Sequence, residues 1–218
     1  MKSGAFFLVA AAVAAGAASP ALAEQGDLIV RARAIIVAPN EKSTGVNPAF
    51  PTGRVGVDNA VMPEVDFTYM WTKHIGTELI LATTKHDLRG RAGLSGVNKL
   101  GSAWALPPVL TVQYHFLPDG KFRPYVGAGA NYTIFYSDKT SSALNAAIGQ
   151  TSLHLKDSFG YALQGGMDID ITKKVFMNFD IKYVDMSTKA RLNTAGAINR
   201  TKVDINPLIF GVGVGMRF

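Results

Sequence analysis

Apolar and polar side chains alternate along most of the chain, as they do in strands whose two faces meet different surroundings. In residues 175–186, Phe179 and Ile181 occupy one face and Asp180 and Lys182 the other. Similar segments are found at 27–38, 61–72, 74–86, 104–116, 123–136, 155–169, 175–186 and 203–218. Most exceed the usual length of about five or six residues, and about ten tilted residues are what a bilayer requires. The pattern predicts membrane-spanning strands.

The links between these segments alternate in length. The links at 72–74, 117–121 and 170–174 are short turns, whereas 39–60, 87–103, 137–154 and 187–202 are long and polar. Short turns on one side and long loops on the other are typical of transmembrane barrels. We therefore predict an all-β fold: an eight-stranded antiparallel transmembrane β-barrel with short periplasmic turns and long extracellular loops. A soluble sandwich explains neither the strand length nor the loop asymmetry.

The N-terminus indicates export. Lys2 precedes a small-residue apolar run, and Ala21-Leu22-Ala23 matches a signal-peptidase site. We expect residues 1–23 to be a signal peptide and 24–218 the barrel, the alternative being a short membrane anchor. No later stretch approaches the roughly 18 apolar residues of a transmembrane helix. The expected location is the outer membrane of a Gram-negative bacterium.

The inward side chains, ordered by height above the short turns, fall into two sets. The lower set is a predicted charge plug of both signs: Arg31, Arg33, Asp66, Glu78, Asp180 and Lys182. The upper set is a predicted hydrophobic lumen: Ile35, Val37, Met62, Ile80, Val109, Phe135, Val184 and Met186. Eight strands enclose only enough space for side chains or one small ligand. The alternative is that the upper set merely fills space.

Pro107 and Pro108 interrupt one strand segment. Because proline cannot donate a hydrogen bond to the ladder, this pair is a candidate weak point in the wall. A solute above a salt-bridged plug would leave sideways through such a point into the membrane. The alternative is that the prolines only mark the start of a strand.

Other chemistry is not expected. The chain has no cysteine, and His74, His86, His115 and His154 share no metal-ligand spacing. We therefore expect neither a metal nor a cofactor. A Ser-His-acid set from Ser158, His154 and Asp157 fails, because adjacent strand residues point apart. We do not expect an enzyme.

The predicted outer loops are basic. Their cations are Lys42, Arg54, Lys85, Arg89, Arg91, Lys99, Lys139, Lys189, Arg191, Arg200 and Lys202. Lipopolysaccharide phosphates are a fitting partner for them, and simple solvation of the loops is the alternative. The expected location excludes nucleic acid as a partner.

Several segments, in this order and spacing, resemble the OmpW family of small outer-membrane proteins over the whole mature length. They are 26–39, 106–116, 123–132, 157–166, 180–183 and 211–218. The resemblance implies an eight-stranded barrel with a narrow channel for small hydrophobic molecules. The terminal Phe218 is similar to the C-terminal signal read by the barrel-assembly machinery. Two functions remain open: passive uptake of hydrophobic molecules, or a structural or adhesive barrel that acts through its extracellular loops.

Overall fold

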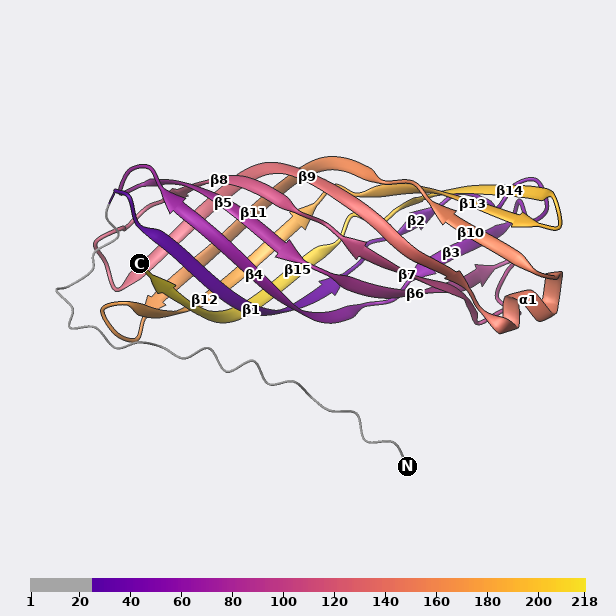
Figure 1. The fold of residues 1–218 in the computed structure, drawn as a ribbon, viewed down its shortest axis with the longest axis horizontal. Coiled ribbons are helices and arrows are strands. Elements are labelled where there is room, and N and C mark those ends of the chain that lie inside the picture. The colour runs from indigo at the N-terminus through magenta and orange to yellow at the C-terminus, as the bar shows by residue number, and fades with distance from the viewer. Residues whose placement is uncertain (1–24) are drawn as a thin grey trace, which may run out of the picture.

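The computed structural model describes residues 25–218, so the predicted signal peptide lies outside the described residues. Eight antiparallel strands form a closed barrel in the order β11-β12-β15-β1-β4-β5-β8-β9, with β9 paired back to β11 (Figure 1). They are β1 (Leu28–Ala38), β4 (Ala60–Met70), β5 (Ile75–Ala82), β8 (Val109–His115), β9 (Phe122–Thr140), β11 (Ser158–Asp170), β12 (Val175–Val184) and β15 (Leu208–Arg217). The predicted fold is confirmed.

The short turns gather at one end of the barrel, at the left of Figure 1, together with the C-terminus and the start of β1. Backbone hydrogen bonds tie these chain ends together: Gly26 donates to Met70, and Phe218 donates to Leu28 at 2.9 Å. We call this the turn end and the opposite one the outer end. Both chain ends lie at the turn end because the number of antiparallel strands in the barrel is even.

The wall has an apolar outer face and a more polar inner one. In β12, Met177, Phe179 and Ile181 are exposed, while Asn178 and Asp180 between them are buried. Near the turn end, outward rings of Tyr69 and Trp71 meet edge to face at 4.7 Å. An exposed apolar belt with aromatic rings is what a barrel presents to lipid.

The long links between the barrel strands contain regular secondary structure of their own. They form the outer extension: β2 (Lys42–Ser43), β3 (Gly53–Val57), β6 (Thr84–Ala92), β7 (Lys99–Leu106), β10 (Thr151–Leu155), β13 (Ser187–Thr194), β14 (Ala197–Asp204) and the helix α1 (Ser142–Ile148). Strands β7, β6 and β3 continue the wall from β9, and β10-β13-β14-β2 form a second sheet. The barrel is therefore prolonged well beyond its lipid-facing belt (Figure 1).

Two predicted strands are each divided in two. The segment 104–116 breaks at Pro107 and Pro108 into β7 and β8, and the segment 74–86 breaks at Thr83 into β5 and β6. The prolines explain the first break, since neither offers a backbone N–H to a neighbouring strand. The two breaks lie side by side in the wall, because β5 pairs with β8 and β6 with β7.

Candidate functional site

The lumen is crossed by a layer of buried charged side chains, which we call the ionic layer. Its members are Arg31, Arg33, Glu64, Asp66, Glu78, Asp168, Asp180 and Lys182, all at most 6% exposed. The register of neighbouring strands creates it, since Arg31 faces Asp66 and Arg33 faces Glu64 across β1 and β4. Directly opposed residues point to the same side of a sheet, here into the barrel.

Arg33 is at the centre of the ionic layer. Its guanidinium lies 2.8 Å from a Glu64 oxygen and 2.7 Å from an Asp66 oxygen. Glu78 and Asp180 lie farther away, at 3.4 and 3.6 Å. A buried guanidinium needs such partners, because an unpaired ion in a dry interior is very costly.

Arg31 and Lys182 complete the network. Arg31 forms ion pairs of 3.0 Å with both Asp66 and Asp168. Lys182 lies 3.2 Å from Glu64 and 3.6 Å from Asp180. The ion pairs therefore link β1, β4, β11 and β12, which lie on different sides of the lumen.

Neutral polar groups fill the remaining positions of this layer. Gln164 donates to Glu78 at 2.6 Å, and Thr111 donates to the same carboxylate at 3.2 Å. Tyr125 donates its hydroxyl to Asp180 and accepts from the Asn178 amide, both at 3.0 Å. These contacts bring β8 and β9 into the network, so that hydrogen-bonded groups reach across the lumen.

Below the ionic layer, towards the turn end, the lumen holds an aromatic ring among cations. The guanidinium carbons of Arg31, Arg123 and Arg217 lie 5.2–5.6 Å from the centre of the Phe176 ring. Arg123 and Arg217 also pair with Asp170. Cation–π attraction strengthens where water is excluded, so these contacts stabilise the packing of side chains at the turn end of the lumen.

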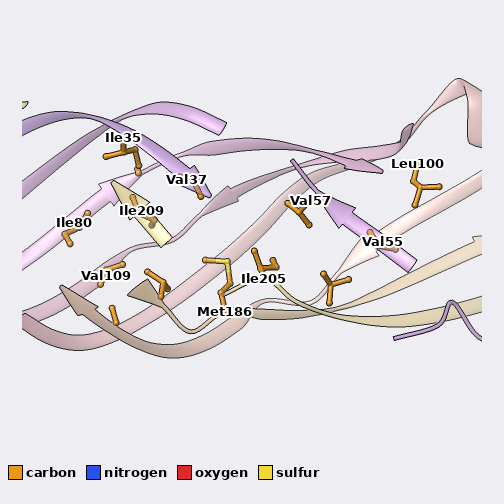
Figure 2. Packing of buried hydrophobic residues seen from close by; sticks show 14 of the residues in the cluster. Ile35, Val37, Val55, Val57, Ile80, Leu100, Val109, Met186, Ile205 and Ile209 are labelled. Carbon is orange, nitrogen blue, oxygen red and sulfur yellow. The ribbon is translucent and has the colours of Figure 1, made fainter. Parts of the chain in front are cut away.

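Above the ionic layer lies an apolar cavity. Its volume is about 940 Å³, which includes open solvent at its mouth. Glu64 and Lys182 form its floor, so their ion pair separates it from the layer below. Figure 2 shows Ile35, Ile80 and Val109 near this floor, with Val55 and Leu100 farther along the extension. The rest of its lining is mostly apolar, with Thr84, His86 and Thr188 as further polar members.

The predicted lumen residues lie on the inner face. Ile35, Val37, Ile80, Val109, Phe135, Val184 and Met186 line the cavity. Met62 is half-buried and packs against the same hydrophobic cluster. The predicted plug residues all belong to the ionic layer, where ion pairs connect them.

Sequence reasoning missed many of the lining residues. Val55, Val57, Leu88 and Ala190 come from segments expected to be loops, Leu155 and Val203 from the first residues of two predicted strands, and Ile209 from a glycine-rich face. It also left Asp168 out of the plug. The lining residues in the long links could have been identified from a weak alternation of polar and apolar positions. In Thr188-Lys189-Ala190-Arg191, for example, every second residue is buried.

The wall has a gap in its backbone pairing at the candidate weak point. Pairing of β5 with β8 ends at Ile80 and Val109, and pairing of β6 with β7 resumes at Thr84 and Ala105. The register is the same on both sides, so Ala82 faces Pro107 across the unpaired stretch. Pro107 also lines the cavity, which places this gap beside the apolar space.

Neither a metal-ligand cluster nor the assembled Ser158-His154-Asp157 set is found among residues 25–218. No group of three or more His, Asp or Glu side chains there could hold a metal ion. Ser158 points inward and accepts from the Ser187 N–H, whereas His154 and Asp157 are exposed. No helix of the described chain is long and apolar enough to cross a membrane.

Known proteins share this architecture. Outer membrane protein W of Escherichia coli is 35% identical over 196 residues, which cover 89% of this chain and 90% of that protein. The crystal structure of OprG from Pseudomonas aeruginosa is 29% identical, with a TM-score of 0.82 and coverage of 89% and 97%. The dibenzothiophene metabolism operon protein PahQ of Pseudomonas aeruginosa is 29% identical over 136 residues, 62% of this chain and 60% of that protein. A model of the OmpW family matches residues 24–218. The chain therefore belongs to the OmpW family of outer-membrane β-barrel proteins, found in the outer membrane of Gram-negative bacteria.

Proposed function

We propose that the protein is a channel for the passive uptake of small hydrophobic molecules, which rest in the upper lumen and leave sideways into the membrane. The observation that supports this proposal is the apolar cavity directly above a sealed ionic layer. The name of PahQ, which refers to dibenzothiophene metabolism, fits a substrate class of apolar aromatic molecules.

Entry follows a continuous apolar path. The hydrophobic cluster that lines the cavity continues through the outer extension to Leu94, Leu100 and Leu144. A solute moving inward exchanges water for apolar side chains, a gain of roughly 25 cal/mol for each Å² buried. The path ends at the Glu64–Lys182 pair, where further movement would strip an ion of its partner.

Exit takes place through the gap between Ala82 and Pro107. Opening it breaks no backbone ladder, because pairing is already interrupted there by the prolines. The outer surface near it is lined by exposed apolar groups such as Leu81 and Leu110, so the solute enters lipid rather than water.

The first test places a charge in the cavity. Val109→Asp should abolish most uptake of an apolar aromatic solute into cells that lack other hydrophobic channels, whereas Val109→Ala should retain it. Ile35→Lys, paired with Ile35→Met, repeats the comparison on β1. Uptake by correctly folded Val109→Asp and Ile35→Lys proteins at the wild-type rate would refute the channel. The structural or adhesive function would then replace it.

The second test closes the gap. The chain has no cysteine, so Ala82→Cys/Pro107→Cys would carry a unique disulfide across the unpaired stretch. Uptake should fall when this variant is oxidised and recover on reduction. Each single-cysteine variant serves as the control, since neither should respond to oxidation. Equal uptake by the oxidised and reduced double variant would exclude this exit.

A further inference from the structure

One face of the outer extension carries closely spaced cations. The sheet β10-β13-β14 turns His154, Lys156, Lys189, Arg191, Arg200 and Lys202 outward, around a shallow surface hollow. The strands alternate strictly here, because Thr188, Ala190 and Thr201 between these cations are buried. We call this surface the basic face.

The register places like charges directly opposite one another. Lys189 faces Lys202 and Arg191 faces Arg200 across β13 and β14. Side chains opposed in this way have Cβ atoms about 5 Å apart, and like charges at such positions destabilise a sheet. A bound anion would relieve this repulsion.

Three cations on the other half of the extension, Arg89, Arg91 and Lys99, are neutralised within the protein. Arg89 pairs with Asp58, Arg91 with Glu41 at 3.0 Å, and Lys99 with Asp87 at 2.7 Å.

On the basic face only Lys202 has such a partner, Asp204 at 2.7 Å. For Lys156, Lys189, Arg191 and Arg200, residues 25–218 supply no carboxylate within ion-pair distance. The positive charge of this face is therefore available to an external anion.

The basic face begins at the edge of the lipid-facing belt. Lys156 lies only three residues before Phe159, an outward ring that is 75% exposed. At about 3.3 Å per residue, the two lie within roughly 10 Å of each other along the strand. In the outer leaflet this is the level of the phosphate groups of lipopolysaccharide, just above its acyl chains.

We propose that the basic face binds the phosphate groups of lipopolysaccharide. Arg191 and Arg200 are the central contacts, because a guanidinium offers a planar pair of donors that matches two phosphate oxygens. Lys156 and Lys189 lie nearer the lipid belt and hold the phosphates closest to the acyl chains. The contact anchors one side of the barrel in the outer leaflet, independently of any transport through the lumen.

The test measures binding of fluorescent lipopolysaccharide to the folded protein in a neutral detergent. Arg191→Gln/Arg200→Gln should weaken binding about tenfold, which corresponds to about 1.4 kcal/mol. The matched control Arg54→Gln/Lys85→Gln removes the same charge from the β3 and β6 half and should bind like the wild type. Arg191→Lys/Arg200→Lys should retain most of the affinity, which separates loss of charge from misfolding.

Two further ligands decide the identity of the partner. Dephosphorylated lipopolysaccharide should bind wild type and Arg191→Gln/Arg200→Gln equally weakly, and phosphatidylglycerol should bind more weakly than lipopolysaccharide. Equal losses in both double variants would overturn the assignment to this face. Undiminished binding of the dephosphorylated form would overturn the role of phosphate, and equal binding of phosphatidylglycerol would overturn lipopolysaccharide as the specific partner.

Discussion

Arg33 provides a direct test of whether the ionic layer is dry. Replacing it by methionine keeps much of the side-chain volume but removes the cation that Glu64 and Asp66 contact at 2.8 and 2.7 Å. Three cations then become two, while five carboxylates remain in the layer: Glu64, Asp66, Glu78, Asp168 and Asp180.

The expected cost follows from the geometry. Charge centres about 4 Å apart attract by about 4 kcal/mol at an effective dielectric constant of about 20. Two close pairs therefore contribute about 8 kcal/mol of gross attraction, part of which offsets the desolvation of the ions. Breaking a buried pair by removing one partner costs about 3–5 kcal/mol net, which is the loss expected for Arg33→Met.

The measurement is the free energy of unfolding in urea, with the barrel held in detergent or lipid. A matched control is Arg91→Met, because Arg91 also pairs with a glutamate, at 3.0 Å, but its side chain is 59% exposed. That change should cost at most about 1 kcal/mol. In Arg33→Met/Glu64→Gln, one of the unpaired carboxylates is neutralised, so part of the stability should return.

Conductance across a planar bilayer gives an independent measurement. If the layer seals the lumen, Arg33→Ala should admit small ions that the wild type excludes. A free energy of unfolding within about 0.5 kcal/mol of the wild type would contradict a dry seal, since that is the ordinary range for exposed substitutions. Unchanged conductance would contradict it as well.

Three further outcomes follow from the structure. Protease added to intact cells should leave the 117–121 turn uncut, and cleavage there in sealed cells would reverse the topology. Gly129→Ala should lower the yield of folded barrel in a refolding assay, since its Cβ would collide with the Leu110 carbonyl, whereas Gly165→Ala, with no atom nearer than 3.9 Å, should fold normally. In the outer extension, burial lowers the pKa of His86. As the pH falls below about 6.5, the unfolded chain therefore binds a proton at this histidine more readily than the folded chain does. Stability should therefore decrease below that pH, and a pH series of urea unfolding should show a smaller loss for His86→Gln than for the wild type.

Where lipid surrounds the barrel, the sequence pattern was sufficient to predict the strands. There the outward residues must be apolar and the inward ones are charged or polar, as with Phe179 and Asp180, so alternation is unmistakable. In the outer extension the outward face contacts water and the inward face accepts small polar residues, so the contrast between the two faces is weaker. Arg200 and Lys202 face water, and the inward Thr201 is small and polar. The same alternation therefore resembles a polar loop.

The composition of the ionic layer was only partly predictable. A strand pattern shows that Asp168 points inward, but not that it lies 3.0 Å from Arg31 across the lumen, because β1 and β11 are not neighbours in the sheet. Contacts across a barrel depend on strand tilt and stagger, which no single segment encodes. The Tyr125 hydroxyl and Asn178 were missed as network members for the same reason.

The relative costs of the two exits favour the lateral one in the proposed transport. Passage through the barrel would require a solute to part Lys182 from Glu64 and Arg33 from its carboxylates, at a cost of several kcal/mol for each buried pair. Movement into lipid costs an apolar molecule almost nothing, since the acyl region is as apolar as the cavity. The remaining obstacle is then the wall, which Pro107 and Pro108 leave unpaired beside the cavity. In the proposed transport, the ionic layer and the unpaired stretch of the wall act together, because the layer that stops a hydrophobic solute also directs it sideways.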